Sequence, residues 1–345
     1  MDRVNKILKG NSYIHQLNKI FKWETMLIFI LILEIVVFGL INPRFLKLNV
    51  LLYSINDFVC ICIISLFVTF VVITGGIDIS VGSIIGLVSI VIGVAWKLAG
   101  VNIWLTIPIA ILSGALCGAL NGFLIAYTGV QAMVVTLGGM FLYSGLSLVV
   151  MGISGASAFE GISGMPQEFI NVSNGSLFNI PNPFIIFIAL VIVSYILLHK
   201  TKYGRYVFLV GINKNTARYS GINTKMVTMS TYMLSGVSAA IAGIVLTSYL
   251  GGSRPDLGAE MTLPIVTAVV LGGTAITGGK GGVIGTALAS VIVGILRFGL
   301  QMANVSSQYI SVAIGLLLIL AVAMRSISVR SLFNLKGSVR LRLSK

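Results

Sequence analysis

One ten-residue run, Thr74 to Ser83, concentrates the residues of this chain that could do chemistry. It reads TGGIDISVGS and places one carboxylate, Asp78, beside the hydroxyls of Ser80 and Ser83 in surroundings that are otherwise almost entirely apolar. An ionisable group at membrane depth costs roughly 3 kcal/mol on insertion scales, so such groups usually face a wet cavity or a polar partner. The glycines around Asp78 favour a broken helix of the kind that lines cavities. We predict that Asp78, Ser80 and Ser83 line a translocation pathway or its gate; the alternative is that Asp78 caps a helix at the membrane boundary.

The other polar or titratable residues near apolar runs are isolated from one another along the chain. They are Glu34, Asp57, His15, His199, Cys60, Cys62 and Cys117, with Gln301, Asn304 and Gln308 as further candidates for polar pathway groups. Two acids on separate segments give little support for a proton relay, and neither histidine has a paired metal ligand near it. The cysteines lack CxxC spacing and behave as small membrane hydrophobes. We therefore predict no catalytic residue, no metal site and no cofactor.

A glycine-rich run, Gly272 to Gly282, has the composition of a phosphate-binding loop but lacks its motif. A P-loop requires a Lys followed by Ser or Thr, whereas Lys280 is followed by Gly281. We therefore predict that this chain does not bind ATP through that motif.

The elements that must position these residues are predicted to be membrane-spanning helices. The 345 residues are 57% hydrophobic and 9% charged, with a mean hydropathy of +1.04, which excludes an ordinary soluble domain. A span needs about 20 mostly apolar residues. Ten segments qualify: 25–42, 50–74, 79–99, 103–127, 132–151, 183–199, 227–250, 263–278, 283–303 and 306–324. We predict an all-α polytopic membrane protein of about ten transmembrane helices, with broken or re-entrant glycine-rich segments, above all between 263 and 303.

Basic residues mark the predicted cytoplasmic side. The formal net charge is +14, but 17 of the 23 lysines and arginines lie in three stretches, 1–24, 200–226 and 325–345. Under the positive-inside rule all three are cytoplasmic, so the charge reflects membrane topology and not a nucleic-acid partner. We predict basic cytoplasmic tails at 1–24 and 326–345, around a transmembrane domain at 25–325 that contains a cytoplasmic loop at 200–226.

Glycines at helical spacing are expected to pack the bundle. Gly114, Gly118 and Gly122 repeat every four residues in one predicted span, and Gly82 and Gly86 do so in another. Small residues at this spacing let helix backbones approach closely inside a membrane.

The loop at 200–226 contains a further motif, formed by Gly211, Asn213, Ala217, Arg218 and Gly221. A basic surface loop could simply bind anionic lipid. The spacing nevertheless resembles the ATPase-coupling segment in the permeases of ribose-type ABC importers, although Thr216 stands where that family usually has Ala. GGIDISVGS at 75–83 and LGGTAITGGKGGVIGT at 271–286 resemble two more motifs of the same family. The three motifs occur in the family's order, and the resemblance covers residues 25–325.

This resemblance implies partners, a location and a ligand class. It implies ATPase subunits that hydrolyse ATP, a soluble ligand-binding protein, and a second permease that is either a homologous C-type chain or a copy of this one, all at a bacterial inner membrane. Segments 34–45, 54–63, 155–166 and 248–264 look most like the D-type permeases of autoinducer-2 import systems. The ligand implied is then a small hydroxylated furanone. A permease for ribose, galactose or another sugar is the close alternative.

Two alternatives come from other functional classes. A secondary transporter would need its own coupling-ion site, typically formed by acidic residues at broken helices. Asp78 alone gives little support for such a site. A membrane enzyme would need a nucleophile and a base placed together, which the sequence does not suggest.

Overall fold

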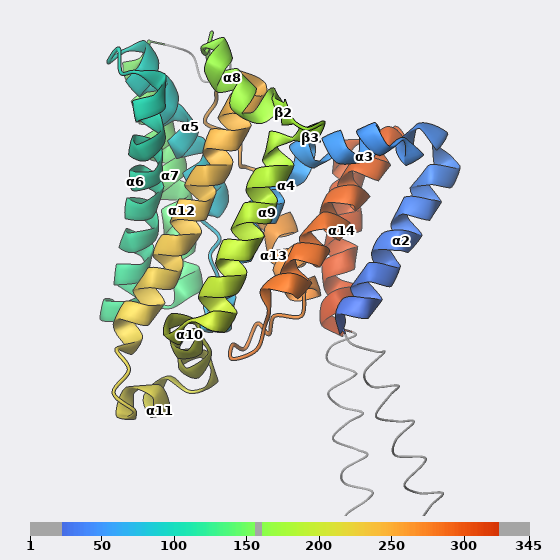
Figure 1. Cartoon of the computed structure of the whole chain (residues 1–345). Coiled ribbons are helices and arrows are strands. Elements are labelled where there is room, and N and C mark those ends of the chain that lie inside the picture. The colour runs from blue at the N-terminus through green and yellow to red at the C-terminus, as the bar shows by residue number, and fades with distance from the viewer. Residues whose placement is uncertain (1–22, 156–160, 324–345) are drawn as a thin grey trace, which may run out of the picture.

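The computed structural model describes residues 23–155 and 161–323 as a bundle of helices that run roughly side by side (Figure 1). The first half of the chain forms α2 (Trp23–Ile41), η1 (Pro43–Leu46), α3 (Leu48–Tyr53), α4 (Ile55–Ile73), α5 (Val81–Lys97), α6 (Ile103–Phe123), η2 (Leu124–Thr128) and α7 (Ala132–Ile153). The second half forms α8 (Gln167–Asn174), α9 (Asn182–Tyr195), η3 (Ile196–Lys200), α10 (Lys202–Ile212), α11 (Lys214–Tyr219), α12 (Thr224–Leu250), α13 (Thr262–Leu271), α14 (Val283–Met302) and a helix at Ser307–Ala323.

Short strand pairs tie loops together near α8. Strand β1 (Ile162–Ser163) pairs antiparallel with β4 (Gly252–Ser253), and β2 (Ser176–Leu177) pairs antiparallel with β3 (Ile180–Pro181). Helices α10 and α11 lie at the opposite end of the bundle (Figure 1). We call these two ends the α8 end and the α11 end.

Seven helices in the described residues are long and apolar enough to cross a membrane. They are Trp23–Ile41, Ile55–Ile73, Ile103–Thr128, Ala132–Ile153, Asn182–Lys200, Thr224–Leu250 and Val283–Met302. Three shorter apolar helices, Val81–Lys97, Thr262–Leu271 and Ser307–Ala323, occupy the other three predicted segments. At 1.5 Å per residue, the ten residues of α13 reach about 15 Å, half of a hydrocarbon core of about 30 Å. The chain is a multi-pass membrane protein, and the count of ten spans stays a prediction.

Helix α4 is the central element of the bundle. Every one of its 19 residues except Asp57 is buried, whereas α2 buries only Leu27, Phe38 and Gly39. A helix that is apolar on all sides is stable only when protein or lipid surrounds it completely. Helices α9, α12, α13 and α14 supply that surrounding for α4. Its last turn is followed by Gly75 at φ +83°, a left-handed conformation that glycine adopts without strain, and the chain then continues outside helix or strand up to Ser80.

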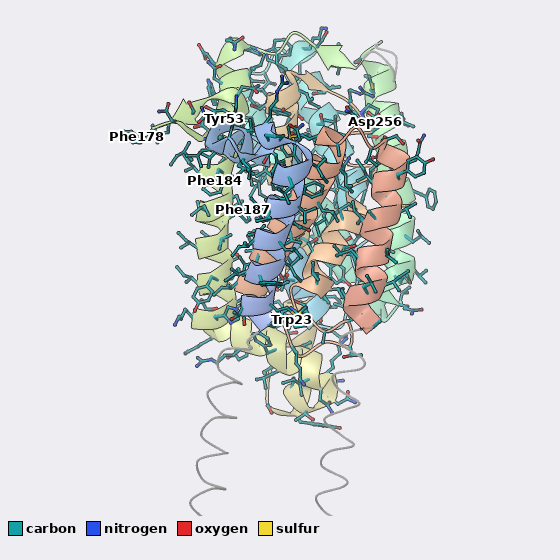
Figure 2. All side chains as sticks on the ribbon, turned by 90° about the vertical axis from the view of Figure 1, so that its right-hand side faces the viewer. Trp23, Tyr53, Phe178, Phe184, Phe187 and Asp256 are labelled. Atoms are coloured by element: carbon teal, nitrogen blue, oxygen red, sulfur yellow. The ribbon has the colours of Figure 1, made fainter. Side chains whose placement is uncertain are left out.

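The outer surface is apolar over much of its height. Large apolar side chains on α2, α6 and α7 are exposed, for example Phe29, Leu112 and Phe141, each at least 60% exposed. Figure 2 places Trp23 at the α11 end of α2 and Tyr53 and Phe178 toward the α8 end. Trp and Tyr are enriched at both membrane–water interfaces, so this distribution suits a bundle embedded in lipid.

The glycine ridges bring helix backbones into close contact. The Cα atoms of Gly114, Gly118 and Gly122 on α6 face the backbone of α12 so closely that a methyl group at any of them would overlap it. Gly82 and Gly86 on α5 face the non-helical link 252–261 in the same way. Packing of this kind replaces the hydrophobic effect as the force that holds helices together in lipid.

Gly118→Ala is expected to destabilise the α6–α12 contact, because its methyl group would overlap the backbone of Tyr232 and Met233. Overpacking of this type costs about 1–3 kcal/mol. Gly145→Ala in α7 is the matched control, since no atom lies within 4 Å of the position its methyl group would take. The midpoint of thermal aggregation in detergent should fall only for Gly118→Ala. Equal midpoints would contradict the close approach of α6 and α12.

The two predicted basic tails fall mainly on residues 1–22 and 324–345, which lie outside the described residues. The domain limits at 24 and 325 and the cytoplasmic orientation of both termini therefore stay predictions.

Candidate functional site

Asp78 lies in a fully buried polar cluster between α4 and α5. Its Oδ1 atom accepts hydrogen bonds from the backbone N–H of Ser80 (3.0 Å) and from the Ser80 hydroxyl (2.7 Å). Its Oδ2 atom accepts a hydrogen bond from the hydroxyl of Ser235 on α12 (2.8 Å). The carboxyl group thus holds the turn that leads into α5 and ties that turn to a helix 157 positions away. The N-cap residue of α5 is Ser80, which has no side-chain capping bond of its own, so Asp78 holds the turn before the helix. Both the pathway role and the capping role of Asp78 stay predictions.

The hydrogen bonds continue from Ser80 into two further helices. The Ser80 hydroxyl accepts from Nδ2 of Asn121 on α6 (2.9 Å), and Oδ1 of Asn121 accepts from the hydroxyl of Tyr143 on α7 (2.9 Å). Both Asn121 and Tyr143 are buried. A buried polar group is costly when it lacks a partner, so a satisfied network fixes the relative positions of the helices that supply it. Four helices, α5, α6, α7 and α12, meet in this way around Asp78.

The segment that carries Asp78 has two different faces. Asp78 points into the bundle, whereas its neighbours Ile77 and Ile79 line a pocket of about 550 Å³. The carbonyl oxygen of Ile77 accepts from the Thr136 hydroxyl (3.2 Å), and that of Ile79 accepts weakly from the Thr262 hydroxyl (3.4 Å). Asp78 therefore positions two pocket-lining residues and does not itself line this pocket.

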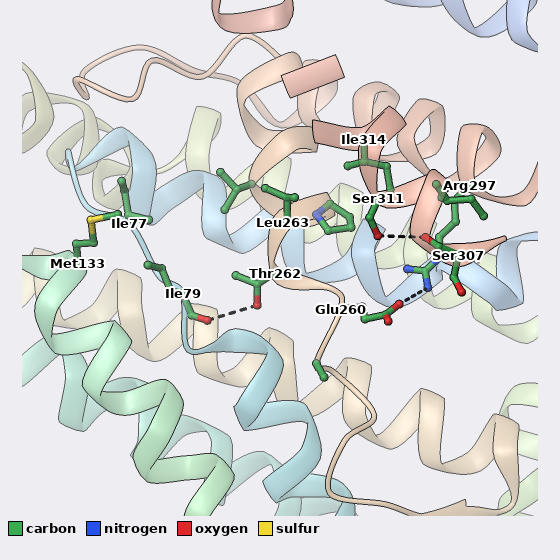
Figure 3. Close-up of a pocket in the computed structure, with 14 residues that line it drawn as sticks. Ile77, Ile79, Met133, Glu260, Thr262, Leu263, Arg297, Ser307, Ser311 and Ile314 are labelled. Carbon is green, nitrogen blue, oxygen red and sulfur yellow. Dashed lines mark hydrogen bonds and ion pairs between the residues drawn. The ribbon is translucent and has the colours of Figure 1, made fainter. Parts of the chain in front are cut away.

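The pocket joins the Asp78 segment to α13, α14 and the helix Ser307–Ala323. It is lined by Ile77, Ile79, Met133, Ala259, Glu260, Thr262, Leu263, Pro264, Val266, Arg297, Ser307, Ile310, Ser311 and Ile314. Figure 3 shows Ile77 and Ile79 toward one end and Arg297, Ser307 and Ser311 toward the other. Arg297 and Glu260 form an ion pair at 3.5 Å. A small polar molecule would find apolar walls and a few convergent polar groups here, as in most ligand sites.

The remaining predicted pathway residues lie elsewhere. Ser83 accepts a hydrogen bond from the Ser144 hydroxyl on α7 (2.9 Å). Gln301, Asn304 and Gln308 are exposed around the turn between α14 and the helix Ser307–Ala323, next to the pocket but not among the residues that line it. A pathway role for these four residues stays a prediction.

The predicted coupling segment forms α11 and its flanking turns. The Asn213 side chain caps α11 by accepting from the backbone N–H groups of Asn215 and Thr216, both at 3.0 Å. Ala217 is buried against the chain itself, whereas Arg218 is exposed and Tyr219 is 91% exposed. Gly221 ends this segment at φ +80°, in space that is otherwise open.

Gly211, at the end of α10, joins this segment to the Asp78 segment. The backbone N–H of Gly279 donates to the carbonyl oxygen of Ile73, the last residue of α4, at 2.8 Å. A methyl group at Gly211 would lie 2.6 Å from the Gly279 nitrogen and would also overlap the Ile73 carbonyl oxygen. Gly278 and Gly279 both have positive φ, so glycine makes this loop shape possible. Helix α10, the end of α4 and the glycine-rich loop 272–282 therefore meet backbone to backbone.

Comparison with known proteins identifies the family. Residues 50–322 match the family described as the permease component of a branched-chain amino acid transport system. This chain belongs to that permease family. The resemblance to importer permeases that three motifs predicted is thereby confirmed, and the family does not support the secondary-transporter and membrane-enzyme alternatives. No solved structure matches the permease.

Several named relatives are similar to the permease over most of their length. It is 48% identical to the autoinducer 2 import system permease protein LsrD of Yersinia pseudotuberculosis serotype O:1b (strain IP 31758), over 89% of this chain and 92% of the relative. The proteins of the same name from Yersinia enterocolitica and Yersinia pestis (strain Pestoides F) are 49% and 48% identical over the same shares. These relatives are named as transport permeases and not as enzymes.

Sequence reasoning missed several residues that the permease places in its polar network and pocket. Asn121, Tyr143 and Ser235 hold the Asp78 cluster together, and Arg297 and Glu260 give the pocket its charge. An amide inside the apolar run 103–127 and an arginine inside 283–303 are the signals that could have marked Asn121 and Arg297.

Proposed function

We propose that the permease forms one half of the translocation pathway of an ABC importer for autoinducer-2. The observation that carries the proposal is the 48% identity to LsrD, which runs over 89% of the chain. The family match at residues 50–322 spans both the Asp78 segment and the residues that line the pocket. A ribose or galactose permease remains the outcome to be tested against it.

The proposed orientation puts the α11 end in the cytoplasm. That end carries the basic loop 200–226, which the positive-inside rule assigns to the cytoplasm. The α8 end then faces the soluble binding protein. A second permease, a C-type homologue or another copy of this chain, completes the pathway on the pocket side, and ATPase subunits dock on α11. Arg218 and Tyr219 supply the exposed docking surface, since Ala217 is buried within the chain.

The proposed mechanism assigns separate roles to the two segments. The Asp78 network holds Ile77 and Ile79 against the pathway, so the network sets the width of the pocket without contacting ligand. When ATP closes the ATPase subunits, α11 and α10 move together, and the contact between Gly211 and Ile73 carries this motion to the 74–80 segment. Packed helices have a few discrete arrangements, so a small displacement of the 74–80 segment would switch the pocket from one arrangement to another.

We expect vesicles that contain the permease with its cognate second permease, ATPase and binding protein to take up autoinducer-2 in an ATP-dependent manner. Ribose and galactose, added in about tenfold excess, should not reduce this uptake by more than about twofold. A preference of about 1.4 kcal/mol makes the competitor bind about tenfold more weakly, so at that excess it occupies at most about half of the sites. Uptake is followed by mass spectrometry of the vesicle contents, with ATP-free vesicles as the control. Uptake of ribose or galactose in preference to autoinducer-2 would assign the permease to sugar import.

A further inference from the structure

Arg297 is a charged residue inside α14, five positions before the end of the helix. Its side chain is only 22% exposed, and the one hydrogen bond that the described residues give its guanidinium group is the 3.5 Å contact to Oε2 of Glu260. A guanidinium group has five N–H donors in a fixed fork. The other charged neighbour of Arg297 among the described residues is Asp57 on α4, with which no hydrogen bond is formed. A charge at membrane depth with few hydrogen bonds usually faces a wet cavity or a ligand path.

The surroundings of Arg297 supply hydroxyl groups and apolar walls. Ser307 and Ser311 lie on the same part of the pocket as Arg297 (Figure 3). The Ser311 hydroxyl donates to the carbonyl oxygen of Ser307 at 3.2 Å, which leaves its oxygen able to accept. Leu263, Ile310 and Ile314 form apolar walls of the same pocket. The pocket therefore offers hydrogen bonds and, next to them, an apolar surface for a carbon skeleton.

We propose that Arg297, Glu260 and Ser311 form a transient binding station for a neutral, polyhydroxylated small molecule on its way through the permease. The proposal rests on the proposed import function and names the ligand class of that pathway. Beside the Arg297–Glu260 pair lies a second carboxyl group, that of Asp57 on α4, whose charge interacts with Arg297. A neutral ligand can enter without adding a charge to this group, whereas a charged ligand would add one that has no partner. Ligand hydroxyls can accept from Arg297 and donate to Glu260.

The weakness of the ion pair favours a transient station. At 3.5 Å the pair is loose, and the Glu260 side chain is 69% exposed, so both partners can turn toward a ligand at little cost. Transport requires a site that is favourable enough to enter and weak enough to leave. A pocket of about 550 Å³ lies in the usual range of small-molecule sites.

Occupancy of the station can be read from the alkylation rate of a single cysteine. Ser311→Cys is placed in a permease whose three native cysteines are replaced by Ala, and the complete importer is purified in lipid nanodiscs. Autoinducer-2 or ribose at millimolar concentration should slow its reaction with a water-soluble maleimide about threefold or more, as expected when ligand exceeds its Kd about twofold. L-leucine should not slow it. Ser306→Cys, exposed but outside the pocket lining, is the positional control and should react equally with and without ligand.

The charge pair is tested in the same background. Arg297→Gln or Glu260→Gln, each combined with Ser311→Cys, should abolish the protection, because a hydrogen bond to a charged group is worth roughly tenfold or more in affinity. Arg254→Gln is the matched control: Arg254 pairs with Asp256 at 2.8 Å, outside the pocket, and its loss should leave protection intact. Two independent variants keep the test decisive if one of them fails to assemble.

The outcomes separate the station from the proposed function. Protection by ribose but not by autoinducer-2, lost in Arg297→Gln, would support the station and overturn autoinducer-2 as the cargo. Autoinducer-2 uptake by the wild-type importer without any protection of Ser311→Cys would overturn the station and leave the proposed function standing. Protection by L-leucine, which has no hydroxyl group, equal to that by autoinducer-2 would overturn the polyhydroxylated ligand class.

Discussion

Asp78→Ala is expected to abolish autoinducer-2 uptake in an importer that still assembles. The substitution removes the acceptor of three buried hydrogen bonds, from the N–H and hydroxyl of Ser80 and from the hydroxyl of Ser235. At roughly 1 kcal/mol for each hydrogen bond, the loss of about 3 kcal/mol changes the population of the ordered 74–80 segment about 100-fold. Ile77 and Ile79 would then no longer be held against the pocket.

Asp78→Asn separates shape from charge. The amide oxygen can still accept from Ser80, and the Ser235 hydroxyl can rotate to accept from the amide nitrogen. We expect partial uptake by this variant, measured per assembled complex in reconstituted vesicles. Asp256→Ala, which removes an exposed carboxylate of the α8-end loop, is the control and should transport normally. Equal loss in Asp78→Ala and Asp78→Asn would instead show a requirement for the charge itself, and normal uptake by Asp78→Ala would remove Asp78 from the mechanism.

The sequence predicted which residue anchors the site but not what the residue touches. A carboxylate among glycines in an apolar run stands out because the residues around it are almost all uncharged and apolar. Asp78 and Ser80 could therefore be found from residue type and spacing alone. Their partners could not be found, since Asn121, Tyr143 and Ser235 lie 41 to 157 positions away along the chain. Spacing also did not reveal that Asp78 would be buried in the bundle while Ile77 lines the pocket, because the path of a segment outside helix and strand depends on tertiary contacts.

The helical class and the order of the apolar segments were likewise predictable, whereas their lengths were not. Hydropathy marks where apolar residues occur, so all ten predicted segments contain an apolar helix. It does not mark where a helix stops inside an apolar run. Helix α13 ends at Leu271, just before Gly272 and Gly273, and α5 begins only at Val81, after the turn that the Asp78 carboxyl group holds. The same limit hid the pocket, which is lined by residues just before α5 and by the first turns of α13.

Gly211→Ala is expected to uncouple ATP hydrolysis from uptake. A methyl group at this position would lie 2.6 Å from the backbone nitrogen of Gly279, and even closer to the carbonyl oxygen of Ile73. Backbone atoms cannot rotate away as a side chain can, so α10 must shift away from the end of α4. The exposed surface of α11 is untouched, and the ATPase should therefore stay attached and hydrolyse ATP. Uptake should fall about tenfold, the effect of a displacement that costs at least 1.4 kcal/mol in the coupled state.

The measurement that decides this prediction is the number of ATP molecules hydrolysed for each molecule of autoinducer-2 imported. The ratio should rise about tenfold in Gly211→Ala at unchanged co-purification of the ATPase. Gly138→Ala in α7 is the matched control, because no atom lies within 4 Å of its added methyl group and the ratio should stay at the wild-type value. A parallel fall of hydrolysis and uptake, at an unchanged ratio, would mean that Gly211 only supports assembly. The contact between α10 and Ile73 would then not be the connection through which the ATPase moves the Asp78 segment.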